Sequence, residues 1–265
     1  MGQVIVVTSG KGGVGKTTTT ANLGTGLAHA GNKVALIDAD IGLRNLDLLL
    51  GLENRIVYDL VDVVEGRVRY RKALIKSKQV EELYLLPAAQ TKDKTAVRPD
   101  QMRDLCEELK AEFDYVIVDS PAGIEQGFQN AIAGAEKSVI VTTPEMSALR
   151  DADRVVGLLE ANEKGAPMLI INRYRPGMVK RGDMLDIDSM MEILNIDLLG
   201  VVPEDEQIVV TTNRGEPAVL NNDSRAGQAY RNICRRLQGE QVAIMQMETD
   251  DGFFARLKRV FGLAK

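Results

Sequence analysis

Short runs of β-branched and aliphatic residues alternate with amphipathic stretches along most of the chain. Each run is almost continuously apolar, which is typical of parallel strands buried on both faces. We expect strands at Val4–Thr8, Val34–Asp38, Leu83–Pro87, Tyr115–Asp119, Ser138–Thr143, Met168–Asn172 and Leu198–Pro203. Helical patterns lie between them, at Thr17–Ala30, Asp100–Glu112, Ala148–Glu163 and Asp186–Leu194. This alternation predicts an α/β fold: a doubly wound, mostly parallel sheet with helices on both faces, whose ligands bind at the carboxyl ends of the strands.

The pattern changes after Leu237. Residues 238–251 are polar, with scattered methionines and no strong period, and we interpret them as a tether. Residues 252–265 are basic and aromatic. The chain is therefore divided into a domain at 1–237, a tether at 238–251 and a terminal segment at 252–265.

Composition and charge exclude several classes of function. The 265 residues carry 33 Lys and Arg against 38 Asp and Glu, a net charge of −5, so any binding to nucleic acid would need a local basic patch. Two distant cysteines, Cys106 and Cys234, and one histidine exclude a disulfide framework and a zinc or iron–sulfur site within one chain. No stretch approaches the ~18–20 apolar residues of a membrane span, and no leader pattern precedes the first strand, so we expect a cytosolic start.

The most specific motif lies between the first predicted strand and the first predicted helix. Residues 10–17 read GKGGVGKT and match the phosphate-binding pattern GxxxxGK[ST]. Its glycines let backbone N–H groups turn toward phosphate oxygens, and the helix N-terminus adds partial positive charge. Lys16 would reach the β- and γ-phosphates, and the Thr17 hydroxyl would coordinate Mg²⁺. The expected nucleotide contacts are Gly10, Lys11, Gly12, Gly13, Val14, Gly15, Lys16, Thr17 and Thr18.

Two further predicted strands end in an acid. The strand at Tyr115–Asp119 has the Walker B pattern, so Asp119 would hold the metal, and the loop after it, with Gly123, would sense the γ-phosphate. Asp38 ends another strand and would lie near the same metal, while Asp40 is our candidate for positioning the attacking water. Acids at strand ends are often only helix caps. Their place beside a phosphate loop favours the metal site.

The string KGGVGKT at residues 11–17 resembles the deviant Walker A motif of the ParA/MinD superfamily of P-loop ATPases. Further strings, at 38–51, 86–91, 119–124, 181–185, 201–205 and 214–217, resemble its division-site branch. The resemblance implies an ATPase that uses ATP and Mg²⁺ and forms an ATP-dependent homodimer. It also implies that Lys11 reaches the partner's phosphates across the dimer, as an arginine finger does.

The same resemblance assigns roles that the residues alone do not. Asn172 would recognise adenine, and the loop near Pro203 would pack on the base. Four residues would lie at the dimer face, where regulatory partners bind: Glu145, Ser147, Arg150 and Asp151. Taken by themselves they form only a strand-to-helix junction, with Ser147 as the predicted cap. The implied partners are a division inhibitor of the MinC type and an activator of the MinE type.

The terminal segment has an amphipathic pattern. At 100° per residue one face carries Phe253, Phe254, Leu257, Val260, Phe261 and Ala264. The flanks carry Arg256, Lys258 and Arg259. This is typical of a helix lying in a membrane interface with its cations toward anionic headgroups, and the alternative is a terminal helix packed on the domain. The resemblance, whose members carry a C-terminal membrane-targeting helix, favours the membrane.

These features together predict an ATP-dependent membrane switch. ATP would favour a dimer that presents two tails to the membrane, and hydrolysis would release the subunits. While attached, the dimer would recruit a division inhibitor to the inner face of the cell membrane, or to the stromal side of a plastid inner envelope. A DNA-segregation ATPase of the ParA type is the alternative from another class, supported only by a small cluster of Arg173, Arg175, Lys180 and Arg181. A flagellar-number regulator differs mainly in the string at 38–51. An electron-donating iron protein is disfavoured because no cysteine follows Asp119 closely.

Overall fold

We describe residues 2–247 of a computed structural model of the chain. Within them the strands form one sheet of eight, in the order β3-β4-β2-β5-β1-β6-β7-β8. Neighbouring strands run parallel except β3, which pairs antiparallel with β4. The strands are β1 Gln3–Thr8, β2 Val34–Asp38, β3 Ile75–Lys76, β4 Leu83–Leu86, β5 Tyr115–Asp119, β6 Lys137–Thr142, β7 Met168–Tyr174 and β8 Asp197–Pro203. The predicted fold class is confirmed, and the seven expected strands are present with ends shifted by no more than about two residues.

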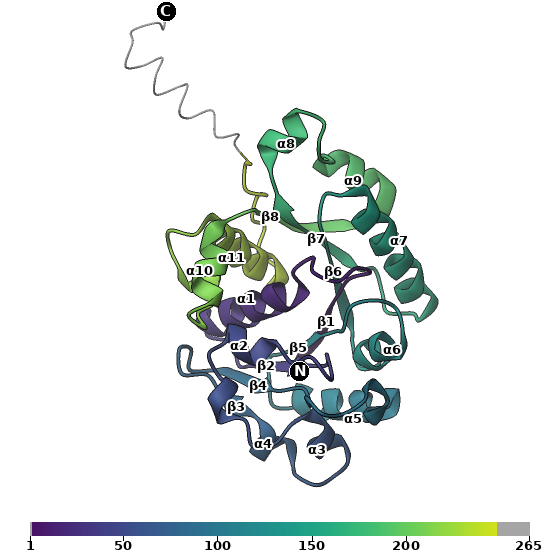
Figure 1. The fold of residues 1–265 in the computed structure, drawn as a ribbon, viewed down its shortest axis with the longest axis vertical. Coiled ribbons are helices and arrows are strands. Elements are labelled where there is room, and N and C mark those ends of the chain that lie inside the picture. Colours follow the sequence, from purple (N-terminus) through teal and green to yellow (C-terminus); the bar gives the residue numbers. More distant parts are fainter. Residues whose placement is uncertain (1, 248–265) are drawn as a thin grey trace, which may run out of the picture.

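Helices cover both faces of this sheet (Figure 1). They are α1 Lys16–His29, α2 Leu46–Leu49, α3 Leu60–Val64, α4 Tyr70–Ala73, α5 Pro99–Lys110, α6 Gln126–Ile132, α7 Met146–Ala161, α8 Pro176–Lys180, α9 Ile187–Leu194, α10 Glu206–Thr212 and α11 Arg225–Leu237. Three short 3₁₀ turns lie at Glu53–Arg55, Lys94–Ala96 and Ala218–Leu220. The four predicted helices correspond to α1, α5, α7 and α9. The sequence interpretation left out α11, although Ala226, Tyr230, Ile233 and Leu237 recur at helical spacing on its buried face.

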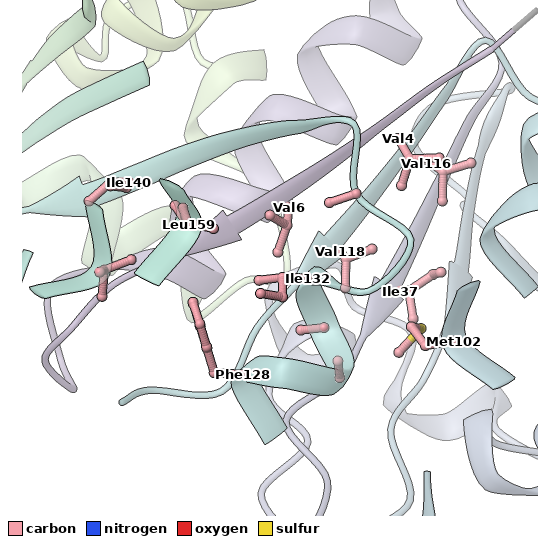
Figure 2. Packing of buried hydrophobic residues seen from close by; sticks show 14 of the residues in the cluster. Val4, Val6, Ile37, Met102, Val116, Val118, Phe128, Ile132, Ile140 and Leu159 are labelled. Atoms are coloured by element: carbon pink, nitrogen blue, oxygen red, sulfur yellow. The ribbon is translucent and has the colours of Figure 1, made fainter. Parts of the chain in front are cut away.

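Alternate residues of the central strands face two separate cores. On one face, Val4, Val6 and Val118 belong to one buried cluster with Phe128 and Ile132 of α6 and with side chains of α5 and α7 (Figure 2). On the other face, the intervening strand residues pack against α1 and α11. Burial on both faces explains why these strands read as continuous apolar runs and not as an alternation.

Helix α1 lies unusually close to its neighbours. A Cβ at Gly24 would lie 2.4 Å from a Leu36 methyl group of β2, and a Cβ at Gly26 would lie 2.7 Å from Cys234 Sγ of α11. Glycine destabilises a helix by about 1 kcal/mol relative to alanine. Here the absence of a side chain at both positions permits the close approach. The helix that follows the phosphate loop is thereby held between the sheet and α11.

The segment after α11 turns back along the domain and passes β8 (Figure 1). Residues 238–247 carry no helix or strand, yet Ile244, Met245 and Met247 pack against the two cores. The first part of the expected tether therefore contacts the domain. The predicted membrane segment, with Phe253 to Arg259 and Phe261, lies outside the described residues. Within residues 2–247 no helix is long and apolar enough to cross a bilayer.

Candidate functional site

The phosphate loop connects the end of β1 to the start of α1 at the carboxyl edge of the sheet. Gly13 and Gly15 have φ angles of 79° and 99°, which lie in the left-handed region that favours glycine. Gly15 directly precedes α1, so the loop's N–H groups and the helix N-terminus converge on one place. Gly12 and Gly13 are exposed. The loop thus has the shape and the access that a phosphate chain requires.

Lys16 is the first residue of α1 and is only 8% exposed. Burial lowers the pKa of its ammonium group, and the nearby carboxylates of Asp119 and Asp40 act in the opposite direction. Lys16 thus places a largely buried cation close to two acids at the start of α1. It is positioned to meet an anionic ligand at the loop.

Asn172 holds the phosphate loop from the neighbouring strand β7. Its Nδ2 donates to the carbonyl of Val14 at 2.8 Å, and its Oδ1 accepts from the backbone N–H of Arg173 at 2.9 Å. A Cβ at Gly15 would lie 2.2 Å from this Nδ2, which explains the glycine there. Asn172 and Pro203 both lie at carboxyl ends of adjacent strands, β7 and β8. The structure thus gives Asn172 a structural contact to the loop, and its role toward adenine stays a prediction.

Asp38 and Asp119 stand opposite each other on neighbouring strands β2 and β5. Both carboxylates are about 1% exposed. Burial, and then the charge of Asp119, raises the pKa of Asp38 to about 8, and burial raises that of Asp119 to about 6. Two acids held together away from water make a site that a cation would stabilise.

The donor set fits Mg²⁺, which favours oxygen ligands and usually takes one or two carboxylates with phosphate oxygens and water. Asp119 Oδ1 accepts from the Thr20 hydroxyl at 3.1 Å, whereas its Oδ2 is buried without a hydrogen-bond partner. The Thr17 hydroxyl also neighbours this carboxylate. An unpartnered buried carboxylate oxygen is costly, and a metal would satisfy it. Thr17 and Asp119 are therefore the residues that fit a metal ligand role best.

Asp38 has a different set of contacts. Its Oδ1 accepts from the N–H of Asp40 at 3.0 Å, and its Oδ2 accepts from Asn45 and Leu46 N–H groups at 3.2 Å each. Both oxygens thus fasten the loop that carries Asp40 to the end of β2. Asp38 contributes negative charge beside Asp119, and its hydrogen bonds position Asp40 near Lys16.

The loop after β5 lies alongside the phosphate loop. Gly123 has a φ of 93°, and the Cβ of Ala122 would lie 3.8 Å from a Cβ placed at Gly12. The two loops therefore lie next to each other at these residues.

Lys11 points away from its own loop toward the start of α7. Its Nζ donates to the Ser147 Oγ at 3.0 Å and lies 3.7 Å from Glu145 Oε2. The prediction that Ser147 caps this helix is wrong: the N-cap is Glu145, α7 begins at Met146, and the Ser147 hydroxyl instead accepts from Lys11. Arg150 is exposed on the same helix, and Asp151 forms an ion pair with Arg154 at 3.8 Å. Of the four residues predicted for the dimer face, two therefore contact the loop lysine.

Two contacts at the site were not expected from the sequence. Thr20, one turn into α1, supports Asp119, and Gly10 is fixed by close approach of α7, because a Cβ there would lie 2.1 Å from the Asp151 carbonyl oxygen. A threonine four residues after Lys16 lies on the same side of the helix, which is the only local signal for the first contact. Nothing local signals the second.

The chain is similar over nearly its whole length to several known proteins. A ParA family model, described as NUBPL iron-transfer P-loop NTPase, matches residues 1–238. The septum site-determining protein MinD of Bacillus subtilis is 56% identical over 266 residues, covering 99% of each chain. The MinC:MinD cell division protein complex of Aquifex aeolicus contains a chain at 52% identity and a TM-score of 0.86, with 93% of this chain and all of that chain covered. MinD of Pyrococcus horikoshii, solved with Mg-ADP, shares 32% identity at a TM-score of 0.81 over 89% of this chain and 96% of its own.

Proposed function

The chain belongs to the MinD family of septum-site-determining P-loop ATPases, and we propose that it works as a membrane switch in which ATP assembles a dimer through Lys11. It hydrolyses ATP with Mg²⁺ and serves in placing the division site. The observation that carries this proposal is the position of the Lys11 ammonium group, which contacts Ser147 at the start of α7 and not its own phosphate loop.

The binding step rests on the phosphate loop. Its backbone N–H groups and the Lys16 ammonium group hold the phosphate chain, and Asn172 keeps the loop in shape through the Val14 carbonyl. Mg²⁺, when bound, neutralises charge on the phosphate oxygens, and Thr17 and Asp119 would hold it.

The hydrolysis step needs a water aligned with the γ-phosphate. Asp40 is placed by the hydrogen bonds of Asp38 near Lys16 and is our candidate for orienting that water. Positioning and charge stabilisation, with little covalent chemistry by the protein, are what phosphoryl transfer requires. Each subunit of the dimer supplies the groups for positioning and charge stabilisation from its own chain, except for one cation.

We infer that Lys11 is that cation, given to the partner's nucleotide. In the single chain its ammonium group is held by Ser147 and Glu145, at 3.0 and 3.7 Å. Lys11 is partly exposed, so its release costs little. An ATP-bound partner would offer phosphate oxygens in place of these two contacts, which favours the dimer only when the γ-phosphate is present.

The partner proposed for the dimer face is a division inhibitor of the MinC type. The Aquifex aeolicus relative is named as a complex with MinC. Glu145, Arg150 and Asp151 present mixed charges on the exposed start of α7 and would contribute to this surface. An activator of the MinE type would act at the same face.

The membrane step is assigned to the terminal segment 252–265. One amphipathic helix with four large apolar side chains partly buried gains only a few kcal/mol. Two on one dimer gain effective concentration, which raises avidity roughly 10²- to 10⁴-fold. Membrane attachment at the inner face of the cell membrane would then depend on ATP.

Sedimentation velocity tests the dimer step. With ATP and Mg²⁺, Asp40→Ala, which should bind but not hydrolyse ATP, is expected to sediment as a dimer, and with ADP as a monomer. The double variant Asp40→Ala, Lys11→Ala should stay monomeric in both. A dimer that forms equally with ADP, or without Lys11, would contradict the proposal.

A further inference from the structure

The polar segment after α11 does not leave the domain directly. Residues 240–247, which we name the strap, carry half-buried Val242, Ile244, Met245 and Met247 between exposed positions. Ile244 and Met247 pack on the core shared with α5 and α7, whereas Met245 packs on the core shared with α1 and α11. Because the two cores lie on opposite faces of the sheet, the strap crosses the sheet's edge, which is strand β8.

One side chain joins the strap to that edge. The guanidinium group of Arg236, near the end of α11, donates to three backbone carbonyls: Leu199 O at 2.8 Å, Val242 O at 2.7 Å and Ala243 O at 2.7 Å. The first belongs to β8 and the other two to the strap. Arginine suits this place because its planar fork offers several donors in fixed directions.

A bulge makes the Leu199 carbonyl available. Leu169 of β7 pairs with Leu198, but Ile170 pairs with Gly200, so Leu199 is an extra residue without an opposite partner. Gly200 leaves room for α11, because a Cβ there would lie 2.4 Å from Ile233 Cγ1 and 3.4 Å from Arg236 Nη1. The edge strand is thus shaped to receive this arginine.

We propose that Arg236 is a positioning residue that fastens the strap across β8 and so fixes the point from which the terminal basic, aromatic segment departs. The consequence for the terminal segment rests on the proposed membrane function, whereas the clamp itself does not. With the strap docked, only residues 248–251 separate it from Gly252, a reach of at most about 14 Å. The whole of 238–251, if released, would reach about 50 Å.

The shorter reach matters for a dimer that binds through two tails. Effective concentration falls roughly as the −3/2 power of tether length once the tether exceeds the span. Releasing the strap lengthens each free tether about 3.5-fold, which lowers effective concentration about six-fold. The clamp therefore strengthens two-tailed attachment without touching either nucleotide or lipid.

Limited proteolysis of the full chain with subtilisin, followed by mass spectrometry, tests the clamp. Arg236→Ala is expected to speed cleavage within 240–247 by about ten-fold or more, and Arg236→Lys, which keeps the charge and loses the fork, should behave similarly. Arg225→Ala removes the same charge from an exposed position on the same helix and should leave the strap unchanged. Unaltered cleavage of the strap in Arg236→Ala would overturn the clamp.

Binding to vesicles of phosphatidylcholine and phosphatidylglycerol with ATP tests the positioning role. Arg236→Ala should bind about six-fold more weakly than wild type or Arg225→Ala, with equal ATP turnover and dimerisation in solution. Ile244→Ser combined with Met245→Ser and Met247→Ser removes the strap's three apolar anchors and leaves Arg236 and β8 intact, so it should give the same two changes. A released strap with undiminished vesicle binding would overturn the positioning role. If the wild type fails to bind vesicles, the proposed function falls and the positioning role with it, whereas the proteolysis experiment still decides the clamp.

Discussion

The ammonium group of Lys11 donates to the Ser147 hydroxyl at 3.0 Å, across the gap between the phosphate loop and α7. Glu145 stands close to the same group at 3.7 Å. A lysine within the phosphate loop is thus engaged by another element of its own chain and not by its own loop. This contact ties the nucleotide site to the face at which we place the second subunit.

Replacing Lys11 by alanine should separate binding from turnover. ATP affinity is expected to change less than about three-fold, because Lys16 and the loop N–H groups remain. Stimulated hydrolysis is expected to fall at least 10³-fold, the scale on which an arginine finger acts. Lys78→Ala, another exposed lysine, is the matched control. Normal stimulated turnover in Lys11→Ala would show an ordinary loop lysine.

The second prediction concerns the metal. Asp119→Asn keeps an oxygen for the Thr20 hydroxyl, which contacts Oδ1 at 3.1 Å, and removes the negative charge from the buried, unpartnered Oδ2. Titration calorimetry should show that Mg²⁺ tightens ATP binding in wild type and has little effect in the variant. Asp114→Asn, an acid at the opposite end of β5, should behave as wild type. Equal dependence on Mg²⁺ in wild type and Asp119→Asn would exclude Asp119 as a ligand.

The loop between β2 and α2 contains a buried ion pair whose loss should be costly. Arg44 Nε lies 3.1 Å from Asp47 Oδ2, with side-chain exposures of 17% and 2%, and Arg44 holds a left-handed φ of 44°. Arg44→Ala leaves Asp47 buried without its cation and should lower the free energy of unfolding by about 3–5 kcal/mol. Arg44→Ala with Asp47→Asn should recover part of this loss. Denaturant unfolding measures both, and a loss below about 1 kcal/mol would contradict the buried pair.

The free energy of unfolding should depend on pH through the carboxylate of Asp205. Its carboxylate caps α10 through Gln207 N–H at 2.9 Å and also accepts from the Ser224 hydroxyl at 2.7 Å and Ala226 N–H at 3.0 Å, at the start of α11. Partial burial alone would raise the pKa of Asp205, but these hydrogen bonds outweigh it, so the folded-state pKa lies below 3.8. The stabilisation is therefore complete above about pH 4 and is lost as the pH falls through the folded-state pKa.

Asp205→Asn should accordingly lower the free energy of unfolding by about 1–2 kcal/mol at pH 7. The difference from wild type should shrink below pH 4, where the wild-type carboxylate protonates as well. Glu206→Gln, the exposed neighbour, serves as the control. A difference that stays constant to pH 3 would show that the charge of Asp205 contributes nothing.

The sequence was sufficient where the signal is local. Strand ends, the phosphate loop and the acids at residues 38 and 119 lie in contiguous patterns whose geometry the backbone dictates. The contacts of Ser147, Arg236 and Asp205 could not be predicted, because each joins segments far apart in the chain. Asn172 was predicted in part. Its place at a strand end was expected, but its hydrogen bond to the Val14 carbonyl depends on the packing of β7 against the phosphate loop. The docked strap was missed for the same reason, since a polar composition gives no sign of three apolar anchors and one arginine.

The central claim is that ATP, through the dimer, drives membrane attachment by the terminal segment. Sedimentation with anionic vesicles tests it most directly, using the intact chain and one truncated before Gly252, each with ATP or ADP and Mg²⁺. The account predicts that the intact chain sediments with vesicles in ATP and at least about ten-fold less in ADP, and that the truncated chain stays in the supernatant in both. Equal sedimentation in ATP and ADP, or vesicle binding by the truncated chain, would contradict it.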